Sequence, residues 1–317
     1  MVQEEYKQYI WTDFYMAFAD RLLEYRFDRE ELVWKILKVY RDKRLNGPNL
    51  GVNPASLHDI DPFTVYALFN QIYIPFNKSG YYYGDIEVVI AAQEFPNTDI
   101  GWGRWAARTK SKQVPYWKER MTLIEGLSRE FDLHVEVPVY FKGVPYTVNL
   151  PSLFYRLTAG GHKEHAVDNL WDLFASALFL ADDDTLENRN SFCQCYNRVL
   201  EQIGDQWEGK HWNWSAWKRD DRNWNITMGL FWIRPYYFMN LDFANRYHLT
   251  KRKMPDEMRD PIRSLGKTVP NASKYMEIRD TCVALLKRRI TCFDFPTLSI
   301  ESEEDWFSHL EKMHRAT

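Results

Sequence analysis

The chain has 317 residues and a formal net charge of −3, and hydrophobic residues make up 45% of it. This composition excludes a disordered chain, and the weak net charge means that a nucleic-acid surface would require local segregation of basic residues. Aromatic residues make up 16% of the chain, which predicts an aromatic core, an aromatic-lined groove or both. The N-terminus lacks the apolar segment of a signal peptide and no apolar run is long enough to span a bilayer, so we expect a cytoplasmic protein without membrane contact.

Apolar residues recur at helical spacing along most of the chain, and residues that cap helices precede several of these runs. Two capping boxes, Asp28 with Glu31 and Asp184 with Glu187, mark the clearest helix starts. The helix that follows Asp184 is expected to end at Gly204, because glycine readily adopts the backbone conformation that terminates helices. In chain order, the predicted helices are residues 12–25, 28–39, 61–72, 168–179, 184–203, 254–265, 271–289 and 301–314.

Strand signals are fewer. Residues 134–140 and 144–150 alternate between apolar and polar side chains around a turn at Lys142–Gly143, which predicts a hairpin. Pro138 and Pro145 lack the amide hydrogen that a central strand donates, so these strands are expected at a sheet edge. Residues 85–92 fit either a strand or a buried helix.

These patterns predict a mainly α fold with minor β, in a helix-rich globular chain of one large domain or two packed lobes. The coarse division is an N-terminal helical part (1–78), an insertion rich in basic and aromatic residues with short strands (79–150), and a helical C-terminal part (151–317). All three parts could also form one domain, since no repeat or flexible linker separates them.

Two stretches interleave aromatic rings with basic residues. Residues 102–120, the first aromatic–basic stretch, contain six basic residues against one acidic residue, and residues 207–237, the second, contain six tryptophans among lysines and arginines. Rings stack on bases while lysine and arginine bind phosphates, so both stretches favour nucleic-acid binding. The candidate nucleic-acid-binding residues are Trp102, Arg104, Trp105, Arg108, Lys110, Lys112, Lys210, Trp212, Trp214, Trp217, Lys218 and Arg219.

Structural explanations compete with this interpretation. Trp224 and Trp232 lie in the apolar run WNITMGLFWI and are expected in the core, whereas a surface role and a core position are equally expected for Trp212, Trp214 and Trp217. The first aromatic–basic stretch is expected to be a solvated basic surface, with ligand binding as one of the roles of such a surface.

No complete catalytic or nucleotide-binding motif is present, so we expect no enzyme activity, no cofactor and no metal ion. The sequence Gly266-Lys267-Thr268 looks like the end of a phosphate-binding loop, but position 261, where the first glycine should stand, is proline. His162 and His165 lack a third metal ligand, and the acidic run 182–184 is explained by a helix connection. The four cysteines have no zinc-binding spacing and are expected to be free thiols.

Four segments, at 11–33, 59–70, 168–189 and 224–249, resemble the N-terminal region of McrB-like AAA+ family ATPases, the motor subunits of modification-dependent restriction systems. The resemblance implies that the chain recognises DNA, often through a modified base, and that a GTP-hydrolysing AAA+ module powers a nuclease subunit. The chain departs from the family pattern in two ways: it has no intact phosphate loop, and it carries extra sequence at roughly 78–128 and 206–222. The family offers no binding motif that transfers position by position.

We therefore expect a DNA-recognition module of a restriction-type antiviral defence system, with DNA, an AAA+ GTPase module and a nuclease subunit as its partners. One alternative is a protein–protein interaction module that docks a motor or effector subunit through exposed rings. The other is a nucleic-acid-modifying enzyme whose catalytic residues are scattered along the sequence. Loss of binding with increasing salt would favour DNA recognition over protein docking.

Overall fold

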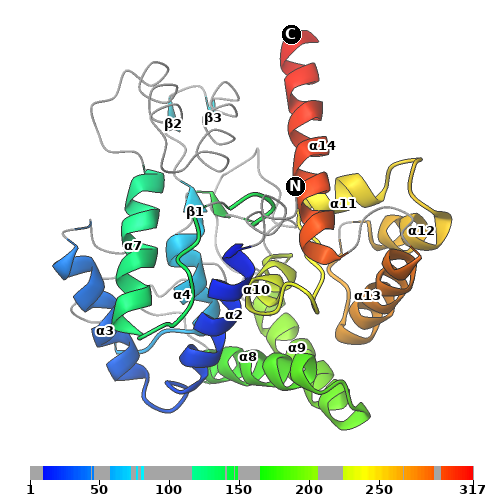
Figure 1. Cartoon of the computed structure of the whole chain (residues 1–317). Helices are drawn as coiled ribbons and strands as arrows, with labels where there is room; N and C mark the ends of the chain where they lie inside the picture. Colours follow the sequence, from blue (N-terminus) through cyan, green and yellow to red (C-terminus); the bar gives the residue numbers. More distant parts are fainter. Residues whose placement is uncertain are drawn as a thin grey trace. The chain divides into compact units, whose positions relative to one another are not determined.

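The computed structural model describes residues 10–43, 45, 58–72, 76–77, 80–81, 116–139, 141–145, 147–148, 165–205, 224–266, 268–288 and 294–316. Helices predominate in this part of the chain (Figure 1), which confirms the expected mainly α fold with minor β. The elements are α2 (Ile10–Leu23), α3 (Arg29–Asp42), α4 (Pro62–Phe69), β1 (Gln71–Ile72), β2 (Phe76–Asn77), β3 (Gly80–Tyr81), α7 (Tyr116–Glu130), β4 (Thr147–Val148), α8 (Ala166–Asp182), α9 (Leu186–Asp205), α10 (Asn225–Ile233), α11 (Phe243–Leu249), α12 (Asp256–Leu265), α13 (Ala272–Lys287) and α14 (Phe295–Ala316).

The chain divides into two compact units. Unit 1 comprises residues 1–60, 64–159 and 311–317, and unit 2 comprises residues 61–63 and 160–310. The boundaries therefore fall inside α4 and α14 as well as between β4 and α8. The three-part division expected from the sequence stays a prediction. Among the described helices, none combines the length and the apolar character that crossing a membrane would require.

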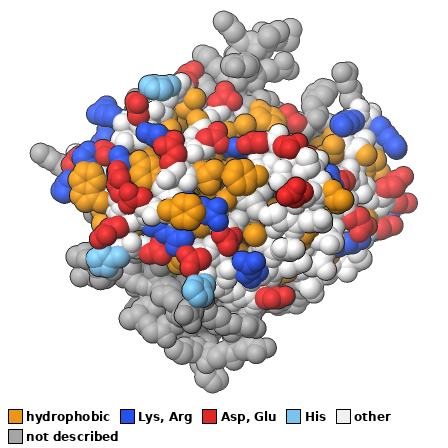
Figure 2. Space-filling model, turned by 90° about the horizontal axis from the view of Figure 1, so that it is seen from below, with side chains coloured by type: hydrophobic (Ala, Val, Ile, Leu, Met, Phe, Trp, Pro, Cys, Tyr) orange, Lys and Arg blue, Asp and Glu red, His pale blue; other side chains and the backbone are white. Residues whose placement is uncertain are grey.

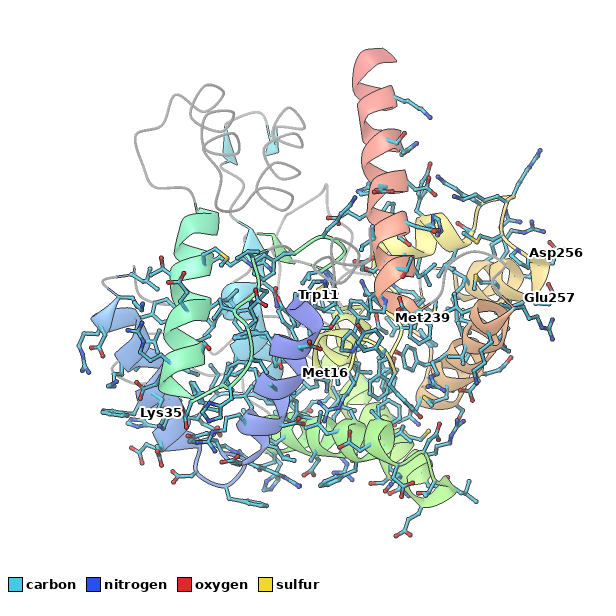
Figure 3. The ribbon with its side chains drawn as sticks, in the orientation of Figure 1. Trp11, Met16, Lys35, Met239, Asp256 and Glu257 are labelled. Atoms are coloured by element: carbon cyan, nitrogen blue, oxygen red, sulfur yellow. The ribbon has the colours of Figure 1, made fainter. Side chains whose placement is uncertain are left out.

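Aromatic side chains form the core of unit 1. Trp11 at the start of α2 is fully buried (Figure 3), and Phe14, Phe18 and Leu22 follow it at helical spacing with no exposed surface. The ring of Phe18 lies 5.3 Å from that of Phe131, centroid to centroid, in an edge-to-face arrangement. Edge-to-face ring pairs are favourable because the positive edge of one ring meets the negative face of the other. The apolar face predicted for the first helix is thus confirmed.

Helices α3 and α7 approach closely because Gly126 has no side chain. A Cβ atom at Gly126 would stand 2.4 Å from Cγ1 of Val39, far inside van der Waals contact. Four residues from Val39 and from Gly126 along the two helices, Nζ of Lys35 on α3 (Figure 3) lies 3.8 Å from the carboxylate of Glu130 on α7. Lys38 donates a hydrogen bond to Glu130 as well. The two helices are therefore joined by an apolar contact with ion pairs beside it.

Short strands add the minor β content of unit 1. Strand β4 pairs in parallel with β1, with Gln71 opposite Thr147, and β2 pairs antiparallel with β3. The predicted hairpin is wrong, because β4 pairs with a strand far away in the sequence and the described residues 134–139 form no strand. The predicted turn is present: the amide of Val144 donates to the carbonyl of Phe141 at 3.1 Å, and Gly143 has φ 77°.

In unit 2, the central helix α10 is buried along its whole length, from Asn225 to Ile233. Helices α8 and α9 pack against each other and α13 packs against α9. Stacked rings join these elements, with Tyr196 and Tyr275 5.7 Å apart and Phe192 and Phe238 5.3 Å apart. The phenol of Tyr275 also accepts a hydrogen bond from the amide of Met239 (Figure 3) at 3.0 Å. The second unit thus has its own aromatic core.

Several helix starts differ from those predicted. The capping box at 184–187 is wrong, because the Thr185 hydroxyl accepts the amide of Asn188 while Asp184 pairs with Arg189. Helix α8 begins at Ala166, so Asp168 lies inside its first turn and faces His165. Asp28 precedes α3 as expected, but its side chain makes no capping hydrogen bond.

Other helix ends are closer to expectation. The Asn271 side chain accepts the amide of Lys274 at 2.9 Å, as a helix N-cap should. Helix α12 begins with the exposed acidic residues Asp256 and Glu257 (Figure 3), which suit the positive end of the helix dipole. Helix α4 ends at Phe69, α9 continues through Gly204, and α14 begins at Phe295, so these three predicted limits need correction.

Candidate functional site

All twelve candidate nucleic-acid-binding residues lie outside the described residues. They fall at 102–112 and 210–219, whereas the described residues run up to 81, from 116 to 205 with gaps, and again from 224. Their role in nucleic-acid binding therefore stays a prediction. What the structure does describe is the end of each aromatic–basic stretch, where the chain enters α7 and α10.

The described end of the first stretch is buried. Arg120 on α7 has only 4% of its surface exposed, and its guanidinium stands 3.9 Å from the centroid of the Phe141 ring. Its Nη2 donates to Oδ1 of Asn70 at 2.8 Å and to the hydroxyl of Tyr15 at 3.3 Å. The expected solvated basic surface is therefore wrong at Arg120. The physical reason is that this side chain points into the aromatic core of unit 1.

The described end of the second stretch is buried too. Trp224 and Trp232 are 1% and 0% exposed, which confirms that both belong to the core. The guanidinium of Arg246 covers the Trp224 ring at 3.9 Å from its centroid, a favourable cation–π contact. Arg234 is 5% exposed and pairs with Asp182 at 3.3 Å. A ligand surface in this stretch would therefore lie before residue 224 or include Tyr236, which is 46% exposed.

Two aspartates of the acidic run at 182–184 pair with arginines in unit 2. Asp182 pairs with Arg234, while Asp184 accepts two hydrogen bonds from Arg189, one of them at 2.8 Å. The hydrogen bonds from Arg189 hold the pKa of Asp184 below its ordinary value, so the carboxylate stays charged. The run lies at the connection between α8 and α9, as expected, but Asp184 pairs with Arg189 and does not cap α9. The described residues contain no group of three or more side chains that could hold a metal ion.

The remnant of a phosphate loop also has a structural explanation. Gly266 is the C-cap of α12, with φ 56°, and Pro261 lies within that helix. The next helix begins only at Ala272, after Pro270. A phosphate loop would instead lead directly from a strand into a helix N-terminus. The expected helix C-cap is confirmed at Gly266, whereas Lys267 lies outside the described residues.

A second ion-pair network ties the α8–α9 connection to α13. Asp280 accepts from Arg189 at 2.6 Å and from Arg279 at 2.6 Å. The Arg279 guanidinium covers the ring of Tyr237 at 3.9 Å from its centroid, and burial raises the pKa of that tyrosine. Because every charged side chain in this cluster has an opposite charge beside it, we assign the cluster a structural role.

His248 connects α11 to α14. Its ring is fully buried, and its Nδ1 shares a hydrogen bond with Asp305, which also accepts from Lys251 at 3.0 Å and Lys253 at 3.1 Å. Burial lowers the pKa of His248. Although burial favours its neutral form, the hydrogen bonds from the lysines and His248 bring the pKa of Asp305 to about 2. An imidazole with no exposed surface cannot reach a substrate, so this dyad is assigned a structural role.

Exposed rings in the described part gather where α11 meets α14. Phe243 is 49% exposed and its ring lies 4.6 Å from that of Trp306, which also contacts Tyr247 and His309. Elsewhere the exposed rings are more isolated, such as Trp34 on α3, which is 54% exposed. On the face shown in Figure 2, hydrophobic side chains lie singly or in small groups among acidic and basic ones.

The buried cluster of Tyr15, Asn70 and Arg120 was not foreseen from the sequence. Asn70 is a polar residue directly after helix α4, in which Thr64 is the only hydroxyl-bearing aliphatic residue among apolar and aromatic ones, and a buried polar side chain at this position needs a partner. That placement was the available signal. The partner, Arg120, is fifty residues away, and no local pattern connects the two.

A protein-family model matches residues 11–79, 109–208 and 211–302, which together make up most of the chain. The chain belongs to the DUF8425 family. The family is described as a domain of unknown function. The DUF8425 match leaves out residues 80–108, and with them the candidate residues Trp102, Arg104, Trp105 and Arg108. Among curated proteins and among solved structures, none matches the chain. The resemblance to McrB-like ATPases stays a prediction.

Proposed function

We propose that this DUF8425 chain is a DNA-recognition module of a restriction-type defence system. The observation that carries the proposal is the composition of residues 102–120, with six basic residues against one acidic residue and four aromatic rings among them, in a chain whose net charge is −3. Such local segregation gives a polyanion a binding surface that the whole chain does not offer. The proposal covers both unmodified and modified bases as the group that the module recognises.

The structure supports this proposal through the anchoring of both stretches. Arg120 and Trp224, which follow the candidate residues of the two stretches along the chain, are buried in the cores of unit 1 and unit 2, respectively. A rigid element next to binding residues suits this role, because the scaffold limits the freedom that a ligand must remove. Because Arg120 and Arg234 are buried, the cations that could bind DNA are those before residue 120 in the first stretch and those before residue 224 in the second.

The proposed partners are DNA, an AAA+ GTPase module and a nuclease subunit. The chain itself would contribute recognition, with no cofactor of its own, while the partners would supply nucleotide hydrolysis and cleavage. A cytoplasmic location is part of the proposal. The free thiols of Cys193 and Cys195 suit such a reducing compartment.

The test is a fluorescence-anisotropy titration of the full chain with labelled duplex DNA, unmodified and base-methylated, over a series of salt concentrations. Trp212→Ala and Trp214→Ala should each weaken binding by about 1–3 kcal/mol, and the loss should persist at high salt. Arg104→Ala and Lys110→Ala should instead lower the salt slope by about one unit each.

Matched controls come from α3, where Trp34 and Arg41 are exposed outside both stretches. Trp34→Ala and Arg41→Ala should leave DNA affinity and its salt dependence unchanged. Equal losses in the test and control variants would mean that the effect is nonspecific. If the Trp212 and Trp214 variants bind normally but melt early, these rings belong to the core and the site assignment fails.

One observation favours a second candidate, a protein-docking module. The rings of Phe243 and Trp306 form a partly exposed aromatic pair where α11 meets α14, and half-exposed aromatic clusters are typical anchors of protein interfaces. Binding of a partner subunit that is insensitive to salt and is lost in Phe243→Ala, with no DNA binding, would support this candidate instead.

A further inference from the structure

The hydrogen bonds of Asn70 and Arg120 leave donors unused inside unit 1. Oδ1 of Asn70 accepts from the Tyr15 hydroxyl at 2.5 Å and from Nη2 of Arg120 at 2.8 Å, so both of its lone pairs are occupied. The amide Nδ2 of Asn70 and the Nε of Arg120 are buried and have no hydrogen-bond acceptor among the described residues. Asn70 is 0% exposed and Arg120 is 4% exposed, so neither donor turns to bulk water.

The charge of Arg120 is also uncompensated in the described part of the chain. Its partners there are an amide, a phenol and the ring of Phe141, and none of them carries a negative charge at neutral pH. Burial raises the pKa of the Tyr15 hydroxyl, which keeps that phenol neutral. A buried guanidinium without an anion is strongly unfavourable, because desolvation of its charge is repaid only by a well-placed acceptor.

We propose that Arg120 and Asn70 bind the carboxylate group of a small molecule. One guanidinium beside a neutral amide balances a single negative charge, which fits a carboxylate better than a doubly charged phosphate. The Phe141 ring lies over the guanidinium, so an acceptor must approach in the plane of that group, and the Nε edge is the free one. Because Nη2 already donates to Asn70 and Tyr15, a carboxylate oxygen would accept from Nε alone at this edge, and the unused Nδ2 of Asn70 offers a second donor.

The site is independent of the proposed DNA recognition, because it uses none of the twelve candidate DNA-binding residues. It lies in the first turns of α7, whose N-terminal dipole adds positive potential to that of the guanidinium. The surrounding core, with Trp11 and Phe69 fully buried, lowers the local dielectric and strengthens an ion pair.

The test is thermal unfolding of the full chain in sodium formate, sodium chloride and sodium phosphate at equal ionic strength. Formate is small enough to probe a buried donor pair. At about ten times its dissociation constant, formate should raise the melting temperature by about 2–4 °C above the value in chloride. Arg120→Gln should abolish this difference, whereas Arg41→Gln, a change at an exposed arginine of α3, should preserve it.

Asn70→Asp provides a second variant that keeps the shape of the site. The new carboxylate would stand where Oδ1 now accepts from Tyr15 and Arg120, so it would compensate the guanidinium internally. We expect this variant to melt at or above the wild-type temperature in chloride and to lose the response to formate. It therefore decides the matter even if Arg120→Gln fails to fold.

Two results would overturn the proposal. The first is a wild-type melting temperature that is the same in formate and chloride. The second is a formate response that survives in Arg120→Gln and Asn70→Asp. A larger response to phosphate than to formate would refute the choice of a carboxylate.

Discussion

Buried arginines have different partners in the two units. In unit 2, Arg234 and Arg279 are at most 9% exposed and each pairs with an aspartate, Asp182 at 3.3 Å and Asp280 at 2.6 Å. In unit 1, Arg120 is as deeply buried but is held by an amide and a phenol. A buried arginine whose charge is balanced by an aspartate has a structural role, whereas one whose charge is not balanced needs an anion from elsewhere. The comparison therefore separates scaffold from candidate site.

The largest effect should come from removing the shared carboxylate in unit 2. Asp280→Ala removes the carboxylate that Arg189 and Arg279 each contact at 2.6 Å, and Arg189 keeps its hydrogen bonds to Asp184. We expect a loss of about 2–3 kcal/mol in the free energy of unfolding, below the value for a fully buried pair because Asp280 is partly exposed. Denaturant unfolding would measure it.

The matched control is Asp260→Ala, which removes an exposed partner of Arg259 at 3.4 Å. Exposed pairs contribute little, so this change should cost less than about 1 kcal/mol. Equal losses in the two variants would break the comparison, because the buried arginines of unit 2 would then not depend on their carboxylates.

A smaller effect is expected where unit 1 relies on apolar contact. Gly126→Ala places a methyl group where Cγ1 of Val39 would be only 2.4 Å away, so α3 and α7 must separate. Overpacking costs about 1–3 kcal/mol, but alanine gains about 1 kcal/mol of helix propensity, so the net loss should be about 1 kcal/mol. Glu125→Ala, an exposed change on the same helix, should not lower the stability measurably. A stabilised Gly126→Ala variant would show that the two helices separate without cost.

The smallest effect is a pH dependence in unit 2. Burial holds the pKa of His248 below its ordinary value of 6.5, although Asp305 opposes the shift by hydrogen bonding and Lys251 and Lys253 reinforce it by charge. The unfolded chain therefore takes up a proton at a higher pH than the folded protein does. This contribution to stability is complete above pH 6.5 and decreases as the pH falls toward the folded pKa.

Melting temperatures measured from about pH 7.5 down to about pH 5.5 would detect this dependence. His248→Gln should flatten the profile, whereas His134→Gln, at an exposed histidine, should leave it unchanged. A profile with the same slope in wild type and His248→Gln would assign the titration to other groups, among them Glu301 at 3.7 Å from Nε2.

Sequence patterns predicted much of the core and most of the described helices, but not α7, α10 or α11. Trp224 and Trp232 were assigned to the core from one apolar run, and both are buried. Asp184 was misassigned as a cap because Thr185, one residue later, caps α9 while Asp184 pairs with Arg189. The hairpin failed for a different reason, since the partner of β4 is β1, a strand distant in the sequence. Local rules do not report distant partners.

The candidate site was less predictable. Basic residues in 102–120 suggested a surface, but the stretch does not reveal that its last arginine turns inward against Phe141. Nor does the sequence alone connect Asn70 with Arg120, because their hydrogen bond depends on how α4 and α7 pack. For the twelve predicted DNA-binding residues, the assignment still rests on residue type and spacing.

The chain passes between the units at residues 60–64, at 159–160 and at 310–311. During synthesis, the helices α2, α3, α4 and α7 leave the ribosome before most of unit 2 has been translated. N-terminal units of large chains generally fold first. A change in α7 such as Gly126→Ala therefore acts on a nascent chain that is still tethered. A change in α13 such as Asp280→Ala acts after the first core has had time to assemble.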